Sequence, residues 1–446
     1  MSTLRGFVDN VLPAAEQNRS RRFSKPDRMS RTFELRRLTA EKSRRRPTTD
    51  FYEYYWAHHM EGTKLRHLWP WARAILLRSP ARVPRQLRPL WVVSWLLAVG
   101  AVVMLVTGRI GPDTVAAKTS WTALVLAGLF VLLQGLAINW LGDAARYLSP
   151  LPANIAARHA IRAEGLALLE QLHESGRYDR IVLVGHSLGS VIGYDILTIY
   201  WTQVNDRHAK PDRPRQAGLE AVEKLGRALE ADSPAVEVAA FQDAQRELWL
   251  EQRRCGSPWL VSDFVTLGSP LAHAELLLAS SPNDLRIRKE QRELPTCPPA
   301  GELQRRNSTV ERYHYNVRYS VNGQPRSIKV LHHAALFAVT RWSNVFVPLR
   351  FGLLGDLVGG PLRPVFGSGI RDAAVTDGPH RLAPLLSHTR YWRGRTEARR
   401  SGGVTALRSV CEALDLEATQ WLRAGAPTAP ATPPQLAEAA PEPSQS

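Results

Sequence analysis

The chain has 446 residues, a net charge of +17 and 44% hydrophobic residues, which fits one large domain with insertions or two to three domains. Its three cysteines, Cys255, Cys297 and Cys411, argue against a disulfide framework or a zinc site and suit a reducing compartment. The first 40 residues contain no apolar core segment, so no cleavable signal peptide is predicted.

The N-terminal part is strongly basic and contains two strand-like pieces, FELRRL and DFYEYYW. Residues 1–90 hold 20 Lys and Arg against 8 Asp and Glu. A run such as residues 42–46 would also suit nucleic-acid binding. We interpret the charge instead as a determinant of membrane topology and a contact with anionic lipid, and expect no nucleic-acid partner.

Two uncharged apolar runs follow, residues 90–107 and residues 119–142. Each is long enough to cross about 30 Å of hydrocarbon as a helix, and tryptophans lie near the ends of the runs. The sequence therefore predicts a two-helix transmembrane hairpin over residues 89–142. Arginines before the first run place both flanking parts in the cytoplasm. Buried core helices or the lid of a soluble enzyme are the alternative interpretations.

A helix is predicted over residues 153–173, and a short buried strand over residues 181–184. The turn GHSLG then separates that strand from a helical pattern. In a G-x-S-x-G turn the serine, Ser187, is held in a strained conformation above the sheet edge. We expect Gly185 and Gly189 to prevent collisions within the turn, and the Leu188 amide to donate to an oxyanion.

The remaining elements are read from composition and periodicity. Residues 203–254 are predicted to be a helical insertion on the rim of the sheet, and residues 264–267 a second buried strand. Residues 281–310 are interpreted as a mobile surface loop. Alternation around Asn322 and Gly323 predicts a hairpin, and the Pro- and Ala-rich residues 424–446 a disordered tail.

A serine nucleophile needs a histidine base and an acid, which follow it in the order Ser, Asp or Glu, His on this scaffold. Asp356 is the favoured acid, because it follows a predicted strand at residues 344–347 and a glycine-bearing loop. Asp372 and Asp377 are the alternatives. Asp263 precedes its strand, at the wrong edge of the sheet, and Asp284 lies in the charged loop.

His388 is the favoured base, because only His380 and His388 follow Asp356 in the chain. His388 stands after an apolar run and before an aromatic pair, whereas His380 stands in a turn without a preceding strand. His332 and His333 precede Asp356 and would need another acid. His186 is expected to support the turn or line the pocket.

These motifs resemble the α/β-hydrolase superfamily, specifically lipase- and esterase-like bacterial membrane-associated hydrolases with EYYWAHHMEGT-like and HTRYW-like segments. The resemblance implies a mostly parallel sheet with helices on both faces, into which the transmembrane hairpin is inserted. It divides the chain into a basic N-terminal part (1–88), the hairpin (89–142), a catalytic domain (143–423, with insertions near 203–254 and 281–332) and the tail (424–446). Such hydrolases begin with a strand and a His-Gly turn that supplies a second oxyanion donor, and no such strand precedes residue 1.

The expected function is a serine hydrolase acting on a carboxylic ester, with a lipidic acyl group, on the cytoplasmic side of a bacterial inner membrane. Its expected partners are an acyl-ester substrate and the bilayer. A non-catalytic, membrane-anchored binding module is the main alternative, and a peptidase is a weaker one. No cofactor is expected. No metal site is expected either, since the sequence has no H-E-x-x-H motif and no clustered Cys and His.

Overall fold

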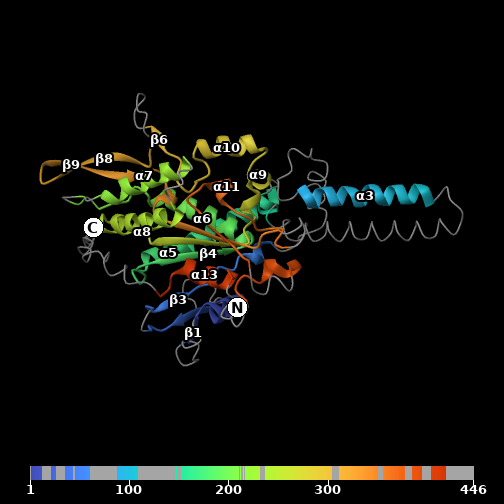
Figure 1. The fold of residues 1–446 in the computed structure, drawn as a ribbon. Coiled ribbons are helices and arrows are strands. Elements are labelled where there is room, and N and C mark those ends of the chain that lie inside the picture. The colour runs from blue at the N-terminus through green and yellow to red at the C-terminus, as the bar shows by residue number, and fades with distance from the viewer. Residues whose placement is uncertain are drawn as a thin grey trace, which may run out of the picture.

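Four parallel strands, in the order β11-β10-β5-β4, form the central sheet of the computed structural model (Figure 1). Their bounds are β4 Ile181–His186, β5 Val261–Leu267, β10 Arg341–Phe346 and β11 Arg371–Ala374. The structure describes residues 2–12, 22–26, 36–43, 46–60, 88–108, 144, 146–148, 152–209, 211, 214, 216–231, 237–303, 311–349, 355–376, 384–393 and 403–417. Because the strands are parallel, their carboxyl ends meet at one edge of the sheet, where sites of such folds form.

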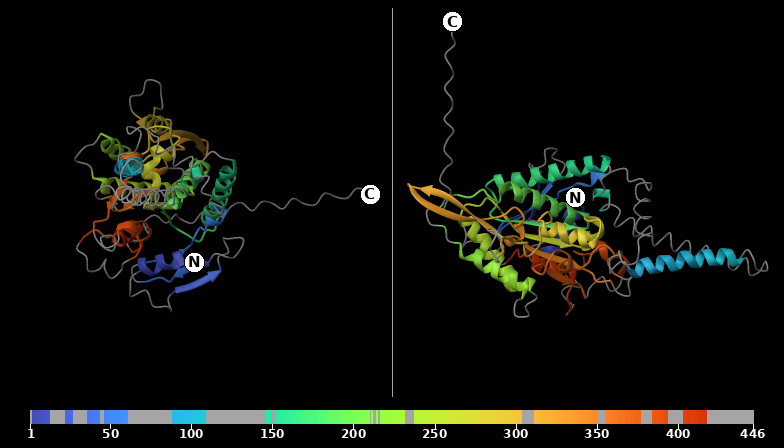
Figure 2. Two further views of the ribbon diagram at one scale, coloured as in Figure 1. Left: turned by 90° about the vertical axis from the view of Figure 1, so that its right-hand side faces the viewer. Right: turned by 90° about the horizontal axis from the view of Figure 1, so that it is seen from above.

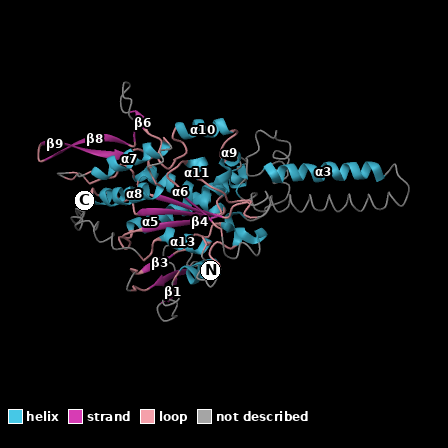
Figure 3. Ribbon diagram, in the orientation of Figure 1, coloured by secondary structure: helices cyan, strands magenta, loops and turns pink. Residues whose placement is uncertain are grey.

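Helices cover both faces of this sheet (Figure 3). Along each strand, successive side chains point to opposite faces, so Phe264 packs into one core cluster and Val265 into the other. The first face carries α5 Pro152–Glu174, α6 Leu188–Val204 and α8 Val238–Arg254. The second carries α13 Ala406–Leu414 and α1 Ser2–Val11. The predicted parallel sheet flanked by helices is therefore present.

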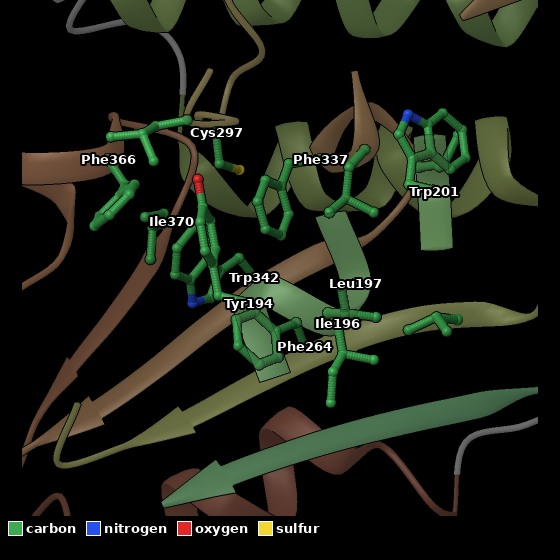
Figure 4. Packing of buried hydrophobic residues seen from close by; sticks show 14 of the residues in the cluster. Tyr194, Ile196, Leu197, Trp201, Phe264, Cys297, Phe337, Trp342, Phe366 and Ile370 are labelled. Carbon is green, nitrogen blue, oxygen red and sulfur yellow. The ribbon is translucent and has the colours of Figure 1, made fainter. Parts of the chain in front are cut away.

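Aromatic side chains fill the larger core cluster (Figure 4). Trp342 of β10 stacks on Phe337 with ring centroids 4.5 Å apart, and Phe264 lies 5.3 Å from the same indole. Tyr194 of α6 reaches the group at 5.7 Å from Trp342. Large buried rings contribute much of the hydrophobic stabilisation of a core, and here they fix α6 against the strands that it follows and precedes.

Smaller elements surround the sheet. An antiparallel sheet of β1 Arg22–Pro26, β2 Arg36–Ala40 and β3 Thr49–Phe51 precedes η3 Ala57–Met60. The predicted hairpin is β8 His314–Val321 and β9 Gln324–Leu331, whose turn residues Asn322 and Gly323 both have positive φ, as a tight two-residue turn requires. The other elements are α7 Ala217–Glu230, η5 Pro270–His273, α9 Ala274–Leu277, α10 Pro282–Glu290, β6 Glu302–Leu303, β7 Glu311–Arg312, η6 Leu336–Ala338, α11 Arg363–Phe366 and η8 Pro384–Thr389.

Two segments differ from their sequence interpretation. Helix α8 lies on the sheet face instead of the rim: Phe241 and Leu248 are fully buried, and the Gln245 amide donates to the Phe337 carbonyl. The charged residues that suggested a rim position lie on the opposite side of this amphipathic helix. The segment interpreted as a mobile loop contains α10, capped by Ser281, and a buried Cys297. The predicted tail lies outside the described residues.

The prediction of a two-span transmembrane hairpin is wrong, and with it the prediction of a two-span protein of the inner membrane. The first run forms α3 Arg88–Gly108, which extends away from the sheet in two views (Figures 1 and 2). In the described part of the chain, no helix combines the length and the apolar character that a membrane crossing needs. The second run lies outside that part.

Candidate active site

The strand-to-helix turn places Ser187 at the carboxyl edge of the sheet. Strand β4 ends at His186 and α6 begins at Leu188, so Ser187 alone makes the turn. Its φ of 52° and ψ of −131° lie in a region that residues with a side chain seldom adopt. Its amide donates to the Leu267 carbonyl at the end of β5 (3.0 Å). The backbone strain of a nucleophile elbow is thus present at the predicted residue.

The two glycines of the motif differ in their steric role. A Cβ on Gly185 would lie 2.5 Å from the Cα of Ser190 and 2.7 Å from the Gly189 carbonyl oxygen, so only glycine fits there. A Cβ on Gly189 would lie no closer than 3.8 Å to its nearest neighbour, the indole nitrogen of Trp56. The expectation that both glycines prevent collisions therefore holds for Gly185 and not for Gly189.

His388 completes a hydrogen-bonded chain from Ser187 to Asp356. The Nε2 atom of His388 lies 2.9 Å from the Ser187 hydroxyl, and its Nδ1 lies 3.0 Å from each oxygen of the Asp356 carboxylate. With the proton on Nδ1 donated to Asp356, Nε2 is free to accept the serine proton. The structure thus brings together the three residues that chain order selected, from positions 187, 356 and 388.

Asp356 is fully buried in the loop after β10, and it is held ionised. Burial by itself would raise the pKa of this carboxyl, but hydrogen bonds from His388 and Tyr391 outweigh it and lower the pKa to about 2. The Tyr391 hydroxyl donates to Oδ2 (2.6 Å) and the Val358 amide to Oδ1 (2.9 Å). A carboxylate that stays charged keeps the imidazole oriented and stabilises its protonated form.

Two glycines make room for that carboxylate. Gly268, at φ 54° after β5, and Gly359 both approach Asp356: a Cβ on either would lie 2.7 Å from Oδ2. A Cβ on Gly359 would also lie 2.6 Å from the Cα of Gly268. The acid therefore occupies a space bounded by two backbones and by the Tyr391 ring, and it has little freedom to move.

His186, which was expected to support the turn or line the pocket, contacts His388. Its Nε2–H donates to the backbone carbonyl of His388 (2.7 Å), and the two imidazole rings lie 4.9 Å apart. Trp392 packs edge-on against His186 at 5.0 Å and contacts Phe7 of α1. Desolvation among these rings, and then the proximity of His388, lowers the pKa of His186 to about 4. At neutral pH it is an uncharged donor that fixes the His388 loop.

Two N–H groups lie close in the structure to the residues that follow Ser187. The Leu188 amide belongs to the first turn of α6, where amides have no acceptor within the helix. The indole of Trp56 lies on the loop after β3 and approaches Gly189, the residue that follows Leu188.

The loop of Trp56 is fixed by contacts along β4 and α5. Tyr52 and Tyr178, the latter just before β4, join their hydroxyls at 2.5 Å, and Tyr178 also donates to Asp50. The Tyr54 hydroxyl donates to the Ile161 carbonyl of α5 (2.6 Å). The segment after β3 thus runs along the outer side of β4 toward the elbow.

The alternative site residues have other positions. Asp263 lies within β5, not before it as predicted, and forms ion pairs with Arg180 and Arg341. Asp372 accepts from the amides of Leu362 and Arg363 and from Asn344. The others are Asp284, which lies in the first turn of α10 and accepts from Ser280; His332 and His333, next to β9; and Asp377 and His380, which lie outside the described residues.

Sequence reasoning missed Tyr391 and Trp56. Tyr391, the first residue of the aromatic pair after His388, is fully buried and also accepts from the Val347 amide (3.2 Å). Its spacing of three residues from His388 was the only available signal. Trp56 lies in the strand-like piece DFYEYYW, and a place beside the elbow follows only once that piece is seen to run along β4.

Comparisons with protein-family models, with curated proteins and with solved structures return no significant match. The resemblance to α/β-hydrolases therefore remains a prediction from the motifs.

Proposed function

We propose that the chain is a serine hydrolase that cleaves a carboxylic ester through an acyl-enzyme on Ser187. The observation that supports it is the chain of hydrogen bonds from the Ser187 hydroxyl through His388 to Asp356, built on a strained turn. Serine is a weak nucleophile unless a base takes its proton, and this arrangement provides the base and the group that orients it.

In the first half of the reaction, the Ser187 oxygen attacks the ester carbonyl while its proton passes to Nε2 of His388. The carbonyl oxygen becomes an oxyanion, for which we assign the Leu188 amide and the Trp56 indole N–H as donors. The tetrahedral intermediate then collapses: the carbon–oxygen bond to the alcohol breaks, and the alkoxide takes the proton from His388. An acyl group remains on Ser187.

In the second half, water gives its proton to His388 and attacks the acyl carbon. The resulting intermediate expels the Ser187 oxygen, which recovers the proton, and the carboxylic acid leaves. Asp356, with its pKa lowered to about 2, stays ionised in both halves and stabilises His388 whenever the imidazole is protonated. The argument for a lipidic substrate rested on the membrane hairpin and is withdrawn with it, so the proposal is limited to carboxylic esters.

The test combines an activity probe with kinetics. A fluorophosphonate should label the full chain once, on Ser187, and p-nitrophenyl esters of increasing acyl length should be hydrolysed. Ser187→Ala should abolish labelling and lower kcat by roughly 10⁴-fold or more. Ser280→Ala, which changes an exposed serine next to α10, is the matched control and should behave as the parent chain. Equal labelling and rates in Ser187→Ala would overturn the proposal, and a parent chain that is neither labelled nor active would favour a non-catalytic binding module.

A further inference from the structure

A second cluster of chemically active side chains lies outside the triad, where η3 meets α5. Two consecutive histidines, His58 and His59, face Glu164 of α5. The Nε2 of His59 lies 3.0 Å from Oε1 of Glu164, and the Nε2 of His58 lies 3.9 Å from Oε2. The three ligand atoms all lie within 4.8 Å of one another.

These separations are close to those between ligands of one metal ion. Two ligand atoms about 2.0–2.2 Å from a metal, at an angle of roughly 90–110°, are about 2.9–3.5 Å apart. The separation between His59 and Glu164 falls in this range. The His58 ring is 46% exposed, so a small rotation brings its nitrogen to the same point.

The contact between His59 and Glu164 lacks the geometry of a hydrogen bond. Among the residues that the structure describes, the buried Nε2 atom of His59 has no hydrogen-bond partner, although a carboxylate oxygen lies 3.0 Å away. A buried nitrogen left in this way loses free energy relative to one with a partner. A cation bound between the nitrogen and the oxygen would satisfy the lone pairs of both atoms.

The backbone on both sides of the cluster is fixed. Before the histidines, the Tyr54 hydroxyl bonds to the Ile161 carbonyl, and after them the Arg146 guanidinium donates to the Met60 carbonyl (2.6 Å). Close packing adds to this, because a Cβ on Gly165, next to Glu164, would lie 3.2 Å from the Tyr54 ring. The two elements that carry the three ligands are thus held in place before any ion binds, which limits the entropy lost on binding.

We propose that His58, His59 and Glu164 form a binding site for a divalent transition-metal cation, best suited to Zn²⁺. Two neutral imidazoles and one carboxylate are a set that zinc accepts, with a fourth position for water or another ligand. Calcium and magnesium prefer oxygen ligands only. The sequence did not reveal this site, because the histidine pair and Glu164 come from distant parts of the chain. The proposal is independent of the proposed hydrolase activity.

The test measures Zn²⁺ binding to the full chain by isothermal titration calorimetry, after removal of metal with a chelator. One equivalent should bind, and it should raise the melting temperature. His58→Ala and Glu164→Gln should each weaken binding by at least tenfold, as the loss of one ligand of three predicts. His159→Ala is the matched control, since it removes an exposed histidine from the same helix and should leave binding unchanged.

Melting curves of the metal-free variants show whether each is folded. Glu164→Gln keeps the size and most contacts of the side chain and should remain folded. The proposal can therefore still be tested with this variant if His58→Ala does not fold. The proposal is overturned if no zinc binds to the parent chain, or if folded Glu164→Gln binds zinc as tightly as the parent chain does.

Discussion

Tyr391 hydrogen-bonds to Asp356 and would act on the reaction only through that carboxylate. Its hydroxyl donates to Asp356 and accepts from the Val347 amide, and burial followed by the nearby Asp356 charge raises its pKa well above 10, so it stays a donor. We expect Tyr391→Phe to lower kcat about tenfold with little change in KM, because one charge-assisted hydrogen bond is lost.

Steady-state kinetics on a p-nitrophenyl ester measure that effect. The matched control is Tyr315→Phe, which removes an exposed hydroxyl from the β8–β9 hairpin and should have no effect. A Tyr391→Phe variant with parental kcat would show that the other donors to Asp356 suffice.

Trp56 is the residue at which the oxyanion assignment is tested. Trp56→Phe keeps an aromatic ring beside Gly189 but removes the N–H, so we expect kcat to fall about 10²- to 10³-fold, as for loss of one oxyanion donor. Labelling by the fluorophosphonate should persist at a reduced rate, because Ser187 and His388 are unchanged. An unchanged kcat would show that the Trp56 indole is not an oxyanion donor.

At the scale of single residues, the sequence was sufficient for the triad and insufficient for its supports. Ser187, Asp356 and His388 follow from a motif and from an order rule that reflects how parallel strands align. Tyr391 and Trp56 act through contacts between segments that are distant along the chain. Local patterns do not contain such contacts, so they were visible only once the elements were placed in space.

The two glycines of the turn between β4 and α6 differ in how much space surrounds them, so we expect opposite results when each is replaced by alanine. Gly185→Ala forces a Cβ to within 2.5 Å of backbone atoms, so we expect loss of about 1–3 kcal/mol of folding free energy and a large loss of labelling. Gly189→Ala places its Cβ in ordinary contact with Trp56 and should leave stability nearly unchanged. Urea unfolding of both variants decides the point; equal destabilisation would contradict the steric argument.

Elements were predicted best where periodicity and turn chemistry agree. The helix expected over residues 153–173 is α5 Pro152–Glu174, and the hairpin turns at Asn322 and Gly323 as predicted. Helix α8 was misplaced because its many charged residues suggested exposure, whereas Phe241, Gln245 and Leu248 line a single buried stripe. Overall composition is a poorer guide to the position of a helix than the side chains on its inner face.

For the whole molecule, buried histidines make stability depend on pH. Burial lowers the pKa of His173 and of His332 to about 4, and the charge of Arg292 also lowers that of His332. In the unfolded chain both histidines have the ordinary pKa of 6.5. Between pH 6.5 and 4 the unfolded state therefore binds more protons, so stability falls as pH falls through this window. Each histidine contributes roughly 1–2 kcal/mol between pH 7 and 5.

Urea unfolding at pH 7 and pH 5 measures this loss, and His332→Gln should reduce it by the share of one histidine. His333→Gln, which changes the exposed neighbour, should not. Identical losses in the parent chain and His332→Gln would show that His332 does not titrate in this window.

The two glycines around Asp356 limit which acidic side chain can occupy that position. Gly268 and Gly359 leave no volume for a further methylene, so a glutamate at position 356, although it keeps the negative charge, would have to push two main chains apart or turn away from the imidazole. The main chain at Gly268 and Gly359 therefore limits the length of the acidic side chain at position 356. A glutamate would be accommodated there only if both loops changed their course.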